Sequence, residues 1–172
     1  MEIFKEKNST LEPVNQIQFK LEKDIQKVVE QNVKNLFNLE FIATEVTVGS
    51  YRIDNLCFDI ENNSFVIIEY KKGSSYSVID QGYTYLQLLL NNKADFLLIY
   101  SEFVNKVVKS SDIDWSQSKI IFISPSFNSY QKDSVNFKGL PFELWEIAKY
   151  QNNLVCLNQH QTSSNEKISS IT

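Results

Sequence analysis

The sequence predicts an α/β fold in which helices flank a mixed central β-sheet. An amphipathic segment is followed by three consecutive strand-like segments, and a second helical segment and further apolar strands come after them. Glycine (4) and proline (3) are scarce among the 172 residues, which favours long regular elements. With 42% hydrophobic residues, a chain of this length is expected to form one domain.

The first half of the chain predicts one helix and three strands. Residues 16–37 are expected to be helical because apolar side chains recur at three- and four-residue spacing, as at Ile17, Leu21 and Ile25. Residues 41–48 and 52–60 alternate as strands do. Residues 65–71 are apolar on both faces, so this strand is expected to be central and covered on both sides.

The second half alternates helices and strands after a break at Gly73-Ser74-Ser75. Residues 102–111 are expected to be a short helix or a loop. The other predicted elements are helix 77–90, strands 95–100 and 120–124, helix 128–137, and a hairpin of strands 142–148 and 154–157.

The chain is expected to divide into a domain and two terminal segments. The domain covers residues 16–158 and follows an N-terminal arm of residues 1–15. Residues 159–172 are polar and rich in Ser, Asn and Gln, so we expect a disordered tail.

Composition and charge exclude several classes of protein. A net charge of −4 excludes a strongly basic nucleic-acid-binding protein, although bound cations or a local lysine patch could still serve such a substrate. A single histidine disfavours a Ser-His-Asp or Cys-His triad. Two cysteines without a signal-peptide core predict a reducing, cytoplasmic setting. No apolar run approaches the ~20 residues of a membrane span, so no membrane partner is expected.

Asp54, Glu69 and Lys71 are the strongest candidates for chemistry. Glu69 and Lys71 leave the same face of a strand, because side chains alternate along it. If the strands at 52–60 and 65–71 form a hairpin, Asp54 can converge on them, and two close carboxylates suit a hard cation such as Mg²⁺. An exposed ion pair at a strand end is the common alternative for Glu-x-Lys. Here four apolar residues precede Glu69, where an unpaired charge is costly.

Two helices supply further candidates. Gln81 and Tyr85 are one turn apart on one face of the helix that follows Lys71. The alternative is that Tyr85 packs in the core and Gln81 is solvated. The first helix offers Glu22 and Glu30.

The ordered series Glu22, Asp54, Glu69-Tyr70-Lys71 and Gln81-Gly82-Tyr83-Thr84-Tyr85 resembles the PD-(D/E)XK nuclease superfamily. The Q-x-x-x-Y element resembles the RecB-type exonuclease and archaeal mismatch-endonuclease branch. Residues 21–145 also look like a bacterial and archaeal group of uncharacterised predicted nucleases. The resemblance implies a restriction-endonuclease-like α-β-β-β-α-β core and Mg²⁺-dependent cleavage of DNA phosphodiester bonds.

The resemblance also implies roles for individual residues. Asp54 and Glu69 would bind Mg²⁺, with Mn²⁺ as a possible substitute, and Lys71 would handle the attacking water. Ile53 stands where the motif has proline, which is a common variation.

Three more positions carry over from the resemblance. Glu22 best matches the helix glutamate that completes the metal shell, with Glu30 as its rival. Gln81 and Tyr85 match the accessory pair that supports the site and contacts DNA.

Other functions remain open from the sequence. The fold could serve as a non-catalytic module that binds nucleic acid or protein, or as a nuclease subunit active only within a defence or repair complex. A homodimer or larger complex is compatible with the chain, and the form of the DNA is not determined. Arg52 could reach a phosphate, although an arginine at a strand start is more often solvated.

Overall fold

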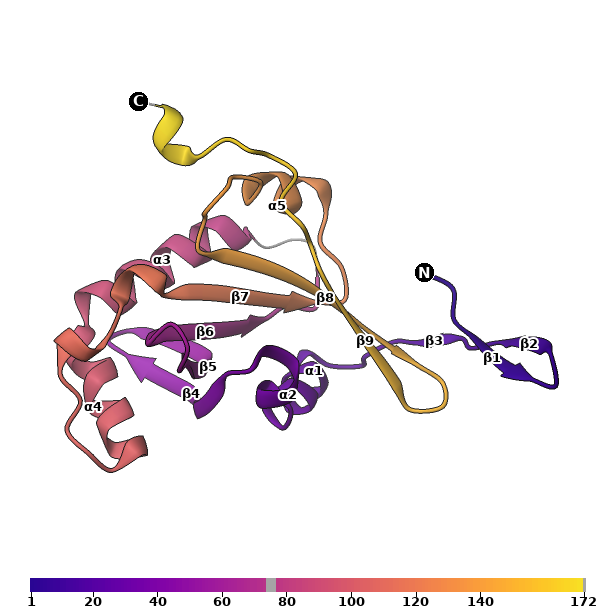
Figure 1. The fold of residues 1–172 in the computed structure, drawn as a ribbon, viewed down its shortest axis with the longest axis horizontal. Helices are drawn as coiled ribbons and strands as arrows, with labels where there is room; N and C mark the ends of the chain where they lie inside the picture. Colours follow the sequence, from indigo (N-terminus) through magenta and orange to yellow (C-terminus); the bar gives the residue numbers. More distant parts are fainter. Residues whose placement is uncertain (74–76, 172) are drawn as a thin grey trace.

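A seven-stranded mixed sheet forms the centre of the computed structural model, which describes residues 1–73 and 77–171 (Figure 1). The strand order is β3-β8-β7-β6-β5-β4, and β9 pairs with β8. The strands are β3 (Gln16–Ile17), β4 (Glu40–Val48), β5 (Tyr51–Asp59), β6 (Ser64–Tyr70), β7 (Lys119–Ser124), β8 (Phe142–Tyr150) and β9 (Leu154–Gln159).

The sheet combines an antiparallel half with a parallel half. Strands β4, β5 and β6 form an antiparallel meander, whereas β7 runs parallel to both β6 and β8. All seven residues of β6 are buried, which confirms the prediction of a central strand covered on both sides. The predicted hairpin near the C-terminus is β8 paired with β9.

Helices cover both faces of the sheet, as the sequence predicts. Successive residues of β6 alternate between two apolar clusters: Phe65 and Ile67 belong to one, and Val66 and Ile68 to the other. The helices α1 (Glu22–Glu30) and α2 (Val33–Phe37) pack on the Val66 side, and α3 (Val78–Asn91) and α4 (Lys93–Val104) pack on the Phe65 side. Cys57 is a free thiol that is fully buried in the apolar cluster on the Val66 side of the sheet.

Residues 95–100 are helical, so the prediction of a strand there is wrong. They lie within α4, where Phe96 and Tyr100 are one turn apart and both buried. Tyr100 stacks on Phe58 with ring centroids 4.1 Å apart, and Phe96 lies beside Phe65. A short apolar run does not by itself distinguish a strand from a buried helix, and packing against the sheet selects the helix here.

The predicted helix at 16–37 is interrupted. Gln16 and Ile17 pair with β8 instead, α1 begins at Glu22, and Gln31–Asn32 separate α1 from α2. The helix predicted at 128–137 is also shorter, because α5 covers Ser129–Ser134. Short 3₁₀ turns occur at Ser110–Asp112 (η1) and Trp115–Gln117 (η2).

The terminal segments lie outside the sheet. The N-terminal arm forms an exposed hairpin of β1 (Phe4–Lys7) and β2 (Thr10–Pro13) that projects from the body (Figure 1). In the C-terminal segment, the backbone amides of Ser163 and Ser164 donate to Asn136 Oδ1, and a 3₁₀ turn, η3, covers Ile168–Ile171. The predicted break at 73–75, beyond Gly73, falls outside the described residues.

No helix among residues 1–73 and 77–171 is long and apolar enough to cross a membrane.

Gly82 allows α3 to approach β8 closely, and its replacement tests this contact. A Cβ at position 82 would lie 2.7 Å from Phe142 Cε1. We expect Gly82→Ala to lower the free energy of unfolding by ~1–3 kcal/mol, because the overlap outweighs the gain in helix propensity. Urea denaturation measures the change, with Gln87→Ala, an exposed position on α3, as the control. A more stable Gly82→Ala protein would contradict the close approach.

Candidate active site

Asp54 and Glu69 lie side by side where β5 and β6 meet. The last paired residues at this end are Asn55 and Ile68, and the two acidic residues follow directly. The backbone N–H of Tyr70 donates to Asp54 Oδ2 at 3.0 Å, and the backbone N–H of Asp54 lies 3.4 Å from Glu69 Oε2. Each carboxylate therefore contacts the backbone of the opposite strand, which holds the two acids together.

Burial and mutual repulsion shift both acids toward their protonated forms. Glu69 is only 5% exposed, and burial, with the nearby charge of Asp54, raises its pKa to about 7. Burial also raises the pKa of Asp54, which the Tyr70 hydrogen bond and the charges of Lys71 and Arg52 partly offset. Two adjacent carboxylates, one buried and one partly buried, that repel each other form a site that a bound cation would stabilise.

Three polar side chains converge on one oxygen of Glu69. Lys71 Nζ lies 3.1 Å from Glu69 Oε1, and Gln81 Nε2 donates to the same atom at 2.9 Å. The Tyr85 hydroxyl lies 3.4 Å from Glu69 Oε1 and 3.1 Å from the carbonyl oxygen of Arg52. Gln81 Nε2 also lies 3.0 Å from the Tyr85 hydroxyl. The expected stripe of Gln81 and Tyr85 thus faces the Glu69–Lys71 end of the sheet.

A hollow opens beside this cluster. Its volume is about 400 Å³, and Lys71, Gln81 and Tyr85 line it together with Tyr51 and Asp80. The hollow thus reaches the three side chains that contact Glu69, whereas neither Asp54 nor Glu69 lines it.

Glu30, and not Glu22, is the helix glutamate that contacts the strand of Asp54. Glu22 is exposed in the first turn of α1, whereas Glu30 lies at the other end of the helix, above β4 and β5. Glu30 Oε1 accepts hydrogen bonds from Asn55 Nδ2 at 2.6 Å and Thr44 Oγ1 at 2.7 Å. Eight residues separate the two glutamates by ~12 Å along the helix, so the structure brings Glu30, and not the expected Glu22, against β4 and β5.

Asn55 connects Glu30 to the site, and the sequence reasoning missed it. It is fully buried; its Nδ2 also donates to the carbonyl oxygen of Asp54 at 2.8 Å, and its Oδ1 accepts from the Tyr70 hydroxyl at 2.5 Å. Burial favours a raised pKa for Glu30, but hydrogen bonds from Thr44, Asn55 and other neighbours outweigh it, so its pKa is lowered. A polar residue next to a candidate acid inside an apolar strand was the available signal.

The metal shell expected from Asp54, Glu69 and Glu22 is not assembled as a trio. Within residues 1–73 and 77–171, no three Asp, Glu, His or Cys side chains are grouped to hold a metal ion. The donors that do converge are the carboxylates of Asp54 and Glu69, and Glu30 is linked through Asn55 and Thr44 to the backbone carbonyl of Asp54.

Fold and side chains define an α/β domain with a partly buried site of two carboxylates and one lysine. No family model matches the chain. It is 48% identical over 158 residues to an uncharacterised protein of Haemophilus influenzae, covering 92% of this chain. The chain spans about half (52%) of the length of that relative.

Solved structures of low sequence identity share part of the architecture. A repair endonuclease from Pyrococcus abyssi is 16% identical, with a TM-score of 0.48, over 77% of this chain and 50% of that chain. EndoMS in its apo form is 18% identical, with a TM-score of 0.48, over 76% and 48%. EndoMS in a complex with double-stranded DNA has a TM-score of 0.42 at 18% identity, over 76% and 47%. Likeness at this level carries no function, which has to be argued from the side chains.

The raised pKa of Glu69 predicts a pH-dependent stability in the absence of metal. Its pKa is about 7 in the folded protein and 4.5 ordinarily, so folding favours the protonated carboxyl. This contribution is complete below about pH 4.5 and is lost as the pH rises through about 7. Relative to the parent, Glu69→Gln is expected to gain on the order of 1–3 kcal/mol in free energy of unfolding across this window.

Denaturation in EDTA at a series of pH values measures this difference, and Glu102→Gln, an exposed position on α4, is the control. A parent and a Glu69→Gln protein with parallel pH profiles would show that Glu69 is not held in this environment.

Proposed function

We propose that this domain is a metal-dependent nuclease that hydrolyses DNA phosphodiester bonds. The observation that carries the proposal is the pairing of the part-buried Asp54 with the buried Glu69, with Lys71 beside them. A structural ion pair would need one acid, whereas this arrangement holds a second carboxylate against the first in spite of their repulsion. Perturbed carboxyl groups beside an open hollow are typical of catalytic sites.

Asp54 and Glu69 are the residues that would hold the metal. Carboxylate oxygens are hard ligands that suit Mg²⁺, and Mn²⁺ accepts the same donors. When bound, such an ion polarises the phosphate and lowers the pKa of a coordinated water. Lys71, Gln81 and Tyr85 contact Glu69 Oε1, whereas Oε2 lies beside the backbone N–H of Asp54, so the supporting side chains fix the orientation of the carboxylate.

Lys71 is the residue suited to act on the reacting groups. Its side chain is 12% exposed, and its ammonium group is positioned by Glu69 at the edge of the hollow. A cation there can orient a water and stabilise the negative charge that develops on the phosphate oxygens. Gln81 and Tyr85 keep the Glu69 carboxylate fixed, and the Tyr85 contact with the Arg52 carbonyl ties α3 to β5.

Cleavage of plasmid and single-stranded DNA with Mg²⁺ or Mn²⁺, with and without EDTA, tests the proposal. We expect parent activity that EDTA removes, and Asp54→Asn is expected to abolish it, because it removes a charged metal ligand. The variant should keep its fold, since it relieves carboxylate repulsion. Cleavage by Asp54→Asn at the parent rate would show that the site is misassigned.

The same assay separates the remaining functions. DNA binding without cleavage by the parent would favour a non-catalytic module, and cleavage that appears only with an added partner would favour a subunit of a larger complex.

A matched pair of substitutions tests the helix glutamate. Glu30→Gln is expected to lower turnover roughly tenfold or more and to raise the Mg²⁺ concentration required, because a charged hydrogen bond that orients Asn55 and the Asp54 carbonyl is weakened. Glu22→Gln, exposed on the same helix, is expected to behave as the parent. Magnesium titrations of the cleavage rate measure both. Loss of activity in Glu22→Gln with none in Glu30→Gln would restore the preference drawn from the sequence.

A further inference from the structure

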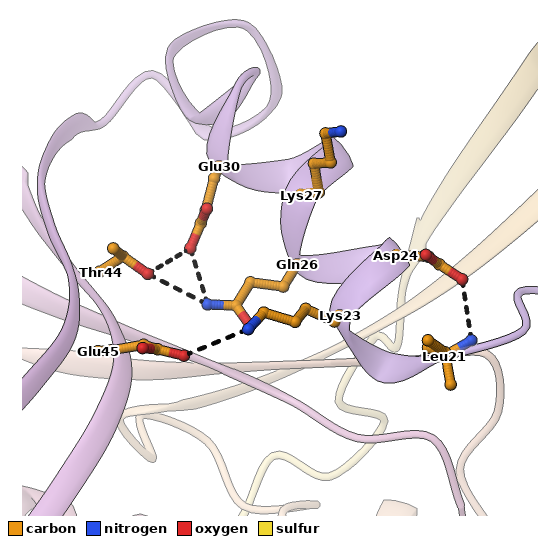
Figure 2. A pocket seen from close by; sticks show the side chains of 8 residues that line it. All are labelled: Leu21, Lys23, Asp24, Gln26, Lys27, Glu30, Thr44 and Glu45. Atoms are coloured by element: carbon orange, nitrogen blue, oxygen red, sulfur yellow. Dashed lines mark hydrogen bonds and ion pairs between the residues drawn. The ribbon is translucent and has the colours of Figure 1, made fainter.

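A line of cationic side chains runs from α1 toward the candidate site. A hollow of about 490 Å³ lies between α1 and β4, and Lys23 and Lys27 line it together with three acids, Asp24, Glu30 and Glu45 (Figure 2). These lysines are four residues apart, so they neighbour each other on the helix surface. Figure 2 shows Lys23 extending toward Glu45 on β4, whereas Lys27 extends away from the sheet.

Glu45 joins this hollow to the strand of Asp54. Its carboxylate Oε1 lies 3.9 Å from Lys23 Nζ and 2.6 Å from Arg52 Nη2. In the register of β4 and β5, the pairs formed by Thr44 and Val46 bracket Glu45 and Asp54, so these two residues lie opposite each other. One acid therefore holds two cations at the position facing Asp54.

The backbone at Glu45 is unusual for a strand. Its φ is 52°, in the left-handed region that a residue with a long side chain rarely adopts. Such a conformation costs of order 1–3 kcal/mol and occurs often at functional sites. The conformation redirects the side chain at this position, which places the carboxylate between α1 and Arg52.

Arg52 is the cationic residue that lies between the α1 lysines and the candidate site. It precedes Asp54 by two residues and so leaves the same side of β5. The Arg52 side chain is 62% exposed, and that of Lys23 is 79% exposed. Both can therefore exchange Glu45 for a ligand.

We propose that Arg52, Lys23 and Lys27 bind the phosphate backbone of DNA on the α1 side of the site, and that Glu45 holds the first two cations when DNA is absent. The inference rests on the proposed nuclease function and specifies where its substrate lies. Glu45 competes with the phosphates for the same cations, so DNA displaces it on binding. Phosphate neutralisation supplies most non-specific affinity for DNA, so a protein of net charge −4 needs a local group of cations. Arg52, Lys23 and Lys27 are here called the cationic track.

The rival explanation is a solvated ion-pair cluster that only joins α1 to β4. Exposed ion pairs contribute ~0–1 kcal/mol to stability. The two explanations predict opposite signs for one substitution: removal of the Glu45 charge strengthens DNA binding if it competes with phosphate, and leaves binding unchanged if the cluster is structural.

The experiment measures binding of short fluorescent single-stranded and duplex DNA in EDTA, by anisotropy, over a series of salt concentrations. Glu45→Gln is expected to bind roughly threefold to tenfold more tightly than the parent. Lys23→Ala and Arg52→Ala are each expected to bind more weakly by a similar factor and to reduce the salt dependence by about one phosphate contact.

Matched controls remove the effect of overall charge. Glu102→Gln changes the net charge by the same amount as Glu45→Gln, and Glu102 is an exposed residue on α4. Lys138→Ala changes the net charge by the same amount as Lys23→Ala, and Lys138 is an exposed residue before β8. Equal shifts in a variant and its control, or no shift in Glu45→Gln, would overturn the track. Melting temperatures verify that the variants are folded.

The result is independent of the cleavage assay. Shifts of the expected signs in a protein that does not cleave DNA would support the track and reject the nuclease function. Metal-dependent cleavage with binding that these substitutions do not change would reject the track alone.

Discussion

The site depends on one constraint, the antiparallel pairing of β5 with β6 up to Asn55 and Ile68. That register places Asp54 and Glu69 at the same end of the two strands, and each acid then contacts the backbone of the other strand. A slip of one residue would turn one of the acids to the opposite face and separate the charges. Because β6 is covered on both sides, a slip of this strand would also turn the Glu69 carboxylate into the apolar cluster on the α1 side.

The two faces of the sheet perform different tasks at this position. On the α3 side, Glu69 meets Lys71, Gln81 and Tyr85 in a largely buried cluster beside a hollow. On the α1 side, Asn55 satisfies its buried polar atoms by bonding to its neighbours and to the Asp54 carbonyl. A satisfied buried network of this kind is rigid, so it holds the acids in spite of their repulsion.

The charges around the site are balanced unevenly. At the candidate site, Lys71 lies beside two acids, Asp54 and Glu69, so one positive charge balances only part of their negative charge. Outside, Glu45 faces two cations and keeps them beside the strand of Asp54. The net charge of −4 does not indicate either local grouping of charges, because each grouping arises from side chains far apart in the sequence.

Sequence alone determined the three consecutive strands β4, β5 and β6, the central place of β6, and the common face of Glu69 and Lys71, because alternation and apolar runs are local signals. It did not determine the helical state of residues 95–100, which depends on Phe96 and Tyr100 packing against the sheet. It also did not reveal that Glu30 rather than Glu22 reaches β5, or that Glu45 faces Asp54. These choices follow from where α1 docks and how β4 is bent, and tertiary contacts between distant segments decide both.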